Sequence, residues 1–276
     1  MTTVPLTIPV QPWFKDHRFN GTIVLAAVET LLLLATEVHD KYPEIDVRIM
    51  EHARFLRFLE IPPQSTSLEA LIDCRRTKDG SIRAKLLSRV RFKTMTRLLE
   101  HGEVVFPAAK KEKTSAIPSE PLEDAVTEVS ADRIYRELVP FGPAYHTLQK
   151  NLLLSAQGAS GSLKAPALPV TGIMEQLGSP FPLDGAMHAA CVHGQQFVDF
   201  IPFPVGFKRR VVSHPTRPER EYLTEVTTVS QTDGELFFNL GIFDKSGTIY
   251  ETITGVHMKD VTGGGIKPPS WIKAVP

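Results

Sequence analysis

The sequence of 276 residues is poor in cysteine, has no excess of either charge and has no long uninterrupted apolar run. Its two cysteines, Cys74 and Cys191, lie far apart and form no C-x-x-C pair, which favours reduced thiols in a cytoplasmic protein. The 31 basic residues balance the 31 acidic residues, so no overall field attracts nucleic acid or an anionic membrane. The composition therefore predicts a cytoplasmic protein that recognises its partners locally and binds neither nucleic acid nor membrane.

The longest apolar stretch, residues 22–38, is too short for a membrane span and is interrupted by polar side chains such as Glu29, Thr30 and Glu37. It begins about twenty residues into the chain and lacks the small-residue cleavage site of a secretory signal. The stretch therefore predicts a buried helix that other elements enclose on most sides.

Segments typical of strands follow this helix, and the same order returns in the second half of the chain. In the first half we expect strands at 47–60, 66–76, 81–92 and 103–106, with a hairpin turn at 78–80. In the second half an apolar helix at 184–200 precedes strands at 205–213, 221–231, 236–243 and 249–258. A helix wrapped by an antiparallel sheet, twice over, predicts an α+β fold of the double hotdog type, although periodicity alone leaves other α+β layouts open.

Shifts in composition divide the chain into four parts. Lysine, glutamate and proline crowd together after residue 108, which is the composition of an exposed connection. Glycines and prolines gather again from residue 263 onward. We expect an N-terminal hotdog half at 1–108, a linker at 109–130, a C-terminal half at 131–262 and a flexible tail at 263–276.

Two short stretches, DHRFNG at 16–21 and LDGAMH at 183–188, each place an acid or a base beside an apolar run. A neutral imidazole can remove a proton while a carboxylic acid donates one, as in the loss of water from a 3-hydroxyacyl group. The two stretches therefore predict one acid/base site built from both halves of the chain.

Four motifs carry a resemblance to a known family, in the order in which that family has them. His17-x-x-x-Gly21 is similar to the start of H-x-x-x-G-x-x-x-x-P, and FGPAY at 141–145 is similar to Y-G-P-x-F. The stretch from Asp184 to His188 is similar to D-x-x-x-Q/H, and IPF at 201–203 is similar to L-P-F. Over roughly residues 12–260 the chain resembles the dehydratase domains of polyketide synthases.

This resemblance implies a double hotdog fold and a dehydratase that converts a 3-hydroxyacyl thioester to the 2,3-unsaturated thioester without a cofactor or metal. The substrate would be linked to an acyl carrier protein or to coenzyme A, and a free-standing chain of this length would act on substrates that other chains make. We expect a monomer or a homodimer. The resemblance implies catalytic roles for His17, Asp184 and His188, and substrate contacts for Gly21, Phe141, Gly142, Pro143 and Tyr145.

The chain departs from the family pattern at positions beside these motifs. Ala26 stands where the first motif has proline, Leu138 and Val139 replace a glycine and a tyrosine, and Tyr145 replaces a phenylalanine. Two alternatives to a dehydratase stay open. One is a related enzyme that uses the same residues to isomerise a double bond or to close a ring. The other, which these departures favour, is a protein that binds acyl groups without catalysis.

The chemistry of each residue sets a condition on its surroundings. Most imidazole side chains are neutral at about pH 7, so His17 suits the role of the base that removes the proton beside the thioester carbonyl. A carboxyl group is ionised at that pH in water, so Asp184 acts as the acid only in an apolar pocket. His188 follows four residues later on the same helical face, where a neutral imidazole orients the carboxyl group. We expect the first N–H groups of the helix after Gly21 to stabilise the enolate.

Plainer interpretations stand beside these. An aspartate before an apolar helix is often an N-cap, and the loop at Gly142 and Pro143 can be a simple turn. A zinc site at His188, Cys191 and His193 is disfavoured because His193 turns away from the face of His188. Basic residues alternate with apolar ones along one predicted strand, at Arg83, Lys85, Arg89, Arg91 and Lys93. This pattern is typical of the solvent-exposed face of an edge strand. The alternative is a surface that docks an acidic carrier protein.

Overall fold

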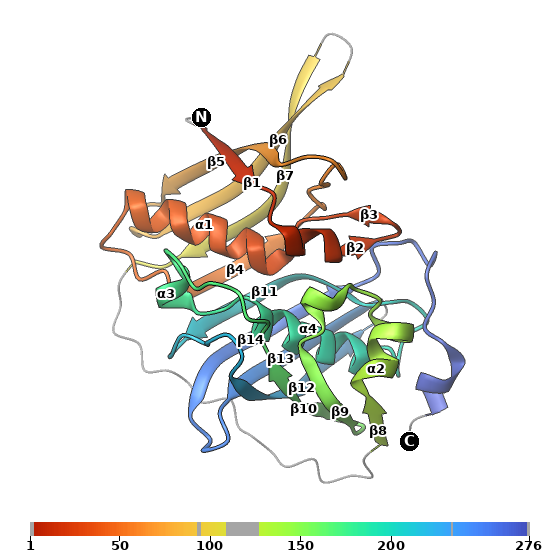
Figure 1. Cartoon of the computed structure of the whole chain (residues 1–276). Coiled ribbons are helices and arrows are strands. Elements are labelled where there is room, and N and C mark those ends of the chain that lie inside the picture. The colour runs from red at the N-terminus through yellow and green to blue at the C-terminus, as the bar shows by residue number, and fades with distance from the viewer. Residues whose placement is uncertain (1–2, 93–94, 109–126, 233, 275–276) are drawn as a thin grey trace.

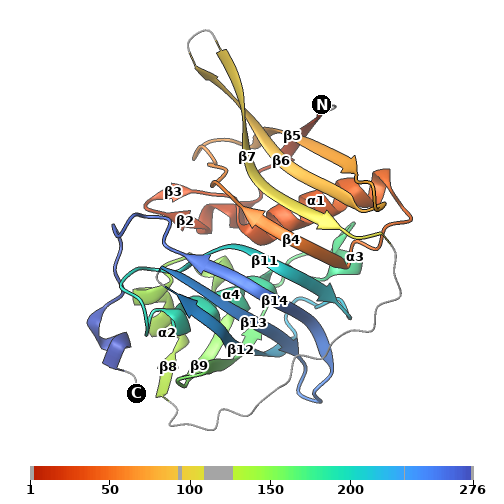
Figure 2. The same cartoon turned by 180° about the vertical axis from the view of Figure 1, so that it is seen from behind.

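The computed structural model describes residues 3–92, 95–108, 127–232 and 234–274. One twelve-stranded antiparallel sheet runs through these residues in the order β1-β5-β6-β7-β4-β11-β14-β13-β12-β10-β9-β8. Two long helices, α1 (Ala27–Lys41) and α4 (Phe181–Gly194), lie on the same side of this sheet (Figure 1). Seen from behind, the strands cover both helices (Figure 2). Each helix is thus held against the strands of its own half of the chain.

The N-terminal half begins with β1 (Val4–Pro9), a short 3-10 helix η1 (Pro12–Asp16) and a small hairpin of β2 (Arg18–Phe19) and β3 (Thr22–Ile23). After α1 come β4 (Ile49–Phe55), β5 (Ser67–Arg76), β6 (Ile82–Phe92) and β7 (Met95–Phe106). The paired strands β6 and β7 project beyond the body of the molecule (Figure 2).

The C-terminal half repeats the plan with more short elements before its helix. They are β8 (Thr127–Ser130), α2 (Ala131–Arg133), the π-helical turn η2 (Ile134–Leu138), η3 (Pro143–Tyr145), β9 (Leu148–Leu154), β10 (Gly158–Lys164) and α3 (Met174–Leu177). After α4 come β11 (Phe203–Val212), β12 (Glu221–Thr232), β13 (Glu235–Phe243), β14 (Ile249–Lys259) and η4 (Ser270–Ala274).

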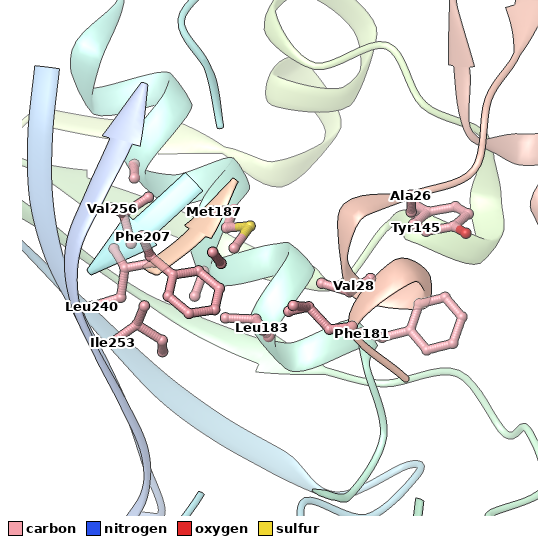
Figure 3. Packing of buried hydrophobic residues seen from close by; sticks show 14 of the residues in the cluster. Ala26, Val28, Tyr145, Phe181, Leu183, Met187, Phe207, Leu240, Ile253 and Val256 are labelled. Atoms are coloured by element: carbon pink, nitrogen blue, oxygen red, sulfur yellow. The ribbon is translucent and has the colours of Figure 1, made fainter. Parts of the chain in front are cut away.

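The two helices differ in how they are buried. In α1 the buried apolar residues Val28, Leu31, Leu34, Ala35 and Val38 recur at the spacing of one helical face. In α4 every residue from Phe181 to Gly194 is buried, because small residues let strands approach on all sides. The helices contact each other near their N-terminal ends, where Figure 3 shows Val28 beside the first turn of α4.

The two halves are joined by main-chain pairing between β4 and β11, so their strands form one sheet. Phe207 pairs with Ala53, and Arg209 pairs with Glu51 across this seam. The backbones approach so closely that a Cβ atom on Gly206 would lie 2.2 Å from the carbonyl oxygen of Ala53. Only glycine fits at that position.

The expected order of one helix followed by strands, in each half, is confirmed by the structure. The first helix starts later than predicted, since residues 22–26 are extended and α1 begins at Ala27. The N–H of Leu25 donates to the carbonyl oxygen of Leu59, and the N–H of Ile61 donates to that of Ile23. Strand-like pairing therefore buries these apolar residues. A short apolar run has the same sequence pattern in a buried strand and in a buried helix, so the pattern alone did not distinguish the two.

Other elements lie outside what the sequence patterns indicated. The expected linker at 109–130 falls mostly outside the described residues, and its last four residues form β8. The expected loose tail from residue 263 instead packs against the body as far as the structure describes it. Ile272 is fully buried there, and the indole N–H of Trp271 donates to Glu137 Oε2 at 2.8 Å. The boundaries between the halves stay a prediction.

Among the described residues, no helix has both the length and the apolar character needed to cross a membrane. Both cysteines are free thiols, Cys191 buried and Cys74 half-buried.

A buried ion pair lies beside the seam, within the C-terminal half. Arg210 of β11 donates from Nε and approaches through Nη2 the same oxygen of Glu251 on β14, both at 2.8 Å, and both side chains are almost fully buried. The guanidinium also contacts the sulfur of Met50 on β4 at 3.7 Å. The side chain of Arg210 thus spans three neighbouring strands at the junction of the halves.

Removing only one partner of this pair should be costly. We expect Glu251→Leu to lower the free energy of unfolding by about 3–5 kcal/mol, because it leaves the buried guanidinium unpaired. The double variant Arg210→Met/Glu251→Leu should recover most of that loss, since it removes both charges. Urea unfolding measures both effects, and a double variant as unstable as the single one would contradict this account.

Candidate active site

His17 lies between η1 and β2, with its ring held in one orientation. Its Nδ1 is 3.0 Å from the carbonyl oxygen of Val24, and the N–H of Val24 donates to the carbonyl oxygen of His17. A carbonyl oxygen can only accept, so Nδ1 carries the hydrogen and Nε2 is the free basic atom of the neutral ring. Burial lowers the pKa of His17, although the negative charge of Asp184 and the bond to Val24 oppose that shift. The ring is therefore a neutral base near neutral pH.

Asp184 and His188 project from one face of α4, one turn apart, and both are buried. Asp184 is the fourth residue of a helix that begins at Phe181, so it does not cap the helix. His188 Nε2 lies 2.9 Å from Asp184 Oδ2, but the two atoms are not aligned for a hydrogen bond. Among the described residues neither atom has an aligned partner, so both can receive a polar group of a substrate.

One cavity of about 360 Å³ brings the acid and the base together. His17 reaches it from the N-terminal half, whereas Asp184 and His188 reach it from the C-terminal half. Phe141 also lines it, stacked on the His17 ring with centroids 4.3 Å apart and tilted against His188 at 5.2 Å. The structure thus brings together four of the residues predicted for the site.

The remaining predicted residues take other places. Gly21 is exposed, has φ +80°, and turns the chain between β2 and β3 outside the cavity lining. Gly142, Pro143 and Tyr145 lie just behind Phe141 and do not line the cavity themselves. Tyr145 is fully buried, with its ring 5.0 Å from that of His17, and its hydroxyl has no hydrogen-bond partner among the described residues.

The segment before His17 is tied to the loop after Phe141. The N–H of Gly142 donates to the carbonyl oxygen of Asp16 at 2.7 Å, and the N–H of Ala144 donates to Asp16 Oδ2 at 2.9 Å. A Cβ atom on Gly142 would lie 2.5 Å from the Asp16 Cγ. The glycine is therefore needed for close approach between the two halves, more than for a simple turn.

The start of α1 also borders the cavity. Ala26 is the N-cap residue, with φ −65° and ψ 149°, and that φ is the value a proline ring imposes. Ala26 therefore has a backbone conformation that a proline at this position would also adopt. The sequence predicts that the first N–H groups of the helix after Gly21 stabilise the enolate. The N–H groups of Val24 and Leu25 precede that helix and bond to carbonyl oxygens instead. The helix that lines the cavity starts at Ala27.

Several cavity residues carry no sequence signal that we recognised. The end of β4 and the loop after it supply residues 55–59, and the segment before Phe141 supplies residues 137–140. Ile266 and Lys267 come from the stretch predicted as a tail. The exposed lining residues Arg18, Arg57 and Lys267 mark where the cavity meets solvent.

His193 lies outside this cavity, and its Nε2 is 2.8 Å from Thr228 Oγ1. Within the described part of the chain, no three histidine, cysteine or acidic side chains form a group that could hold a metal.

A comparison with protein families identifies the class to which this fold and site belong. The family profile described as polyketide synthase dehydratase N-terminal domain matches residues 113–266, more than half of the chain. The chain belongs to the polyketide synthase dehydratase family. A search of curated protein sequences gave no match.

Solved structures with the same fold include the dehydratase domain of RzxB from Pseudomonas fluorescens, at TM-score 0.74 and 14% identity over 93% of this chain and 94% of that chain. A dehydratase domain of a trans-AT polyketide synthase from Brevibacillus brevis matches at TM-score 0.74 and 16% identity, over 94% and 93%. A bifunctional dehydratase-cyclase domain in ambruticin biosynthesis matches at TM-score 0.67 and 18% identity, over 93% and 91%. These likenesses confirm the double hotdog fold predicted from the sequence.

The contact between Gly142 and Asp16 leads to a prediction about stability. We expect Gly142→Ala to lower the free energy of unfolding by about 1–3 kcal/mol, because the added methyl group displaces Asp16. Adding Asp16→Ala removes the clashing carboxyl group, so the double variant should lose less than the sum of the two single variants. Urea unfolding of all three variants measures this. Additive losses would show that the two residues do not interact in this way.

Proposed function

We propose that the protein removes water from a 3-hydroxyacyl thioester and releases the 2,3-unsaturated acyl thioester, with His17 as the base and Asp184 as the acid. The observation that carries the proposal is the cavity in which a basic imidazole from one half meets a buried carboxyl group from the other. Dehydration requires two groups of this kind, one for each end of the same substrate bond.

In the proposed reaction His17 accepts one proton from the substrate and Asp184 donates another to it. His17 Nε2 takes the proton from C2 of the acyl chain, and negative charge develops on the thioester oxygen. The first turn of α1, beginning at Ala27, supplies backbone N–H groups at the cavity that favour this charge. Asp184 gives its proton to the 3-hydroxyl group as the C3–O bond breaks, and water leaves. A proton then returns from His17 to Asp184, which restores both groups.

The surroundings of the cavity support a thioester carried on an anionic handle. Its lining is mainly apolar and includes Phe19, Phe58 and Phe203, whose rings pack on one another. The exposed lining residues Arg18, Arg57 and Lys267 add positive charge to the entrance. An acyl carrier protein or coenzyme A, both of which carry phosphate, fits this combination.

Mass spectrometry tests the reaction directly. A 3-hydroxyacyl thioester incubated with the protein should lose one water molecule, and His17→Ala and Asp184→Asn should each lower kcat by about a hundredfold or more. Rearrangement without a change of mass would indicate an isomerase or a cyclase instead. If the substrate stays unchanged both on a carrier protein and on coenzyme A, the result would indicate a protein that binds acyl groups without catalysing a reaction.

The role of His188 is separable from that of the acid. If His188 orients the Asp184 carboxyl group, His188→Gln keeps a polar group at similar reach, whereas His188→Ala keeps none. We expect kcat to be about tenfold higher in the glutamine variant than in the alanine variant, equivalent to about 1.4 kcal/mol of activation free energy. Steady-state kinetics with the same substrate decides this. Equal losses in the two variants would argue against orientation by His188.

A further inference from the structure

The basic residues that alternate along β6 fall into two groups with different surroundings. β6 lies between β5 and β7, so it is not the edge strand that the sequence pattern indicated. In the inner group, Lys85 Nζ lies 2.6 Å from both Glu100 Oε2 and Glu103 Oε2. Arg83 Nε lies 3.9 Å from Glu103 Oε1. These carboxylates offset the charge of the inner group, and Lys93 lies outside the described residues.

The outer group lies on a two-stranded ribbon that leaves the sheet. Among the described residues, β6 pairs with β5 only as far as Leu87, and β7 pairs with β4 only as far as Gly102. Beyond these positions β6 and β7 pair only with each other and project from the body of the molecule (Figure 2). We call residues 88–92 and 95–99 the β6–β7 arm. A two-stranded ribbon by itself is marginally stable in water, so a surface that covers the arm would stabilise it.

The β6–β7 arm presents cations and apolar side chains together. Its described residues include Arg89, Arg91 and Arg97 and no acidic residue. Neither Arg89 nor Arg91 forms an ion pair with a described residue. Leu98 lies opposite Arg89 in the ladder and is 43% exposed, and Met95 is 54% exposed. Arginine and methionine are enriched in protein–protein interfaces, so the arm is complementary to a protein surface that is acidic and partly apolar.

The root of the β6–β7 arm is bonded to the loop at the edge of the cavity. Ser88 Oγ lies 2.7 Å from His101 Nε2. His101 Nδ1 lies 3.3 Å from the carbonyl oxygen of Arg57 and 3.2 Å from that of Phe58. A carbonyl oxygen can only accept, so Nδ1 carries the hydrogen and Nε2 accepts from the Ser88 hydroxyl group. Because His101, Arg57 and Phe58 all line the cavity, the arm begins at the edge of the candidate active site.

We propose that the β6–β7 arm docks the acidic surface of an acyl carrier protein, which presents its acyl chain to the cavity from this side. This inference rests on the function proposed above, and it selects a carrier protein rather than coenzyme A as the source of the thioester. The charge of coenzyme A lies in its phosphates, which the exposed lining residues Arg18, Arg57 and Lys267 can meet without the arm. The exposed apolar side chains of the arm require an apolar counterpart, which a folded protein supplies.

One carrier domain is large enough to contact the arm while its acyl chain enters the cavity. A strand rises about 3.3 Å per residue, so Arg89 and Arg91 lie within about 10 Å of Ser88 along the arm. Ser88 itself contacts His101 of the cavity lining. A domain of about 100 residues has a radius of gyration of about 13 Å, which spans this length.

Binding of a carrier protein without its prosthetic group tests the docking surface independently of turnover. The probe is a purified, nitrogen-15-labelled acidic acyl carrier protein in its apo form, whose amide shifts are followed as the wild type or a variant is added. We expect Arg89→Glu/Arg91→Glu to raise Kd by about tenfold or more at about 50 mM salt, and by much less at about 1 M salt, where exposed charges are screened. No shift with the wild type at millimolar concentration would overturn the proposal.

A matched control separates the arm from the charge of the whole protein. Lys150→Glu/Arg217→Glu changes two exposed cations of the C-terminal half and alters the net charge by the same amount. We expect its Kd for the apo carrier protein to match that of the wild type. An equal rise of Kd in the control and in Arg89→Glu/Arg91→Glu would contradict docking on the arm.

Kinetics give a second measure of the same surface. In Arg89→Glu/Arg91→Glu, KM for a 3-hydroxyacyl group on the carrier protein should rise about tenfold. Its kcat, and KM for the same acyl group on coenzyme A, should stay as in the wild type, because neither arginine lines the cavity. An equal rise of KM for both substrates would overturn the proposal. If neither substrate loses water, the proposed function fails, and the titration with the apo carrier protein still decides whether the arm docks it.

Leu98→Ser tests the apolar part of the surface. The side chain is exposed, so the fold is retained, and Kd for the apo carrier protein should rise about threefold to tenfold at low and at high salt alike. Sedimentation of the wild type alone tests the other occupant, a second copy of this chain. A dimer that Leu98→Ser dissociates, together with an unchanged Kd for the carrier protein, would assign the arm to self-association and overturn the proposal.

Discussion

The close approach of the segment before His17 to the loop after Phe141 is the constraint on which the site depends. Asp16 accepts hydrogen bonds from Gly142 and Ala144, which lie in the other half of the chain. Through these bonds His17, the proposed base, is fixed against the half that carries Asp184, the proposed acid, and Phe141 is stacked on the imidazole ring. Every other feature of the cavity, from its apolar lining to the buried carboxyl group of Asp184, is arranged around that spacing.

The seam between β4 and β11 complements this local contact at the scale of the whole molecule. Main-chain pairing and the close contact at Gly206 join the halves into one sheet, and Arg210 of β11 contacts Met50 of β4 across the same seam. The site is therefore assembled by two kinds of connection, a continuous sheet behind it and a short polar bridge beside it. Neither connection involves the residues proposed to act on the substrate.

Much of this could be predicted from the sequence, because apolar runs and turn residues depend on local chemistry. The second helix, the strands after it and the stretches around His17 and Asp184 all have local patterns, and the structure places those two residues at one cavity. What could not be predicted depends on packing between distant segments. Residues 23–26 are all apolar, which fits a helix and a paired segment equally well, and only their bonds to Leu59 and Ile61 decide between the two. The role of Gly142 also depends on a partner from far along the chain, Asp16.

The continuous sheet has a consequence for how a substrate enters. In proteins whose two domains rotate about a hinge, the site between the domains can open to admit a large ligand. The main-chain hydrogen bonds between β4 and β11 resist such a rotation here. Under the proposed function, an acyl chain therefore enters a cavity of fixed width, at whose edge the exposed side chains of Arg57 and Lys267 lie. In the proposed reaction, the fixed separation of the His17 imidazole and the Asp184 carboxyl group selects which two neighbouring carbons of the chain lie between them.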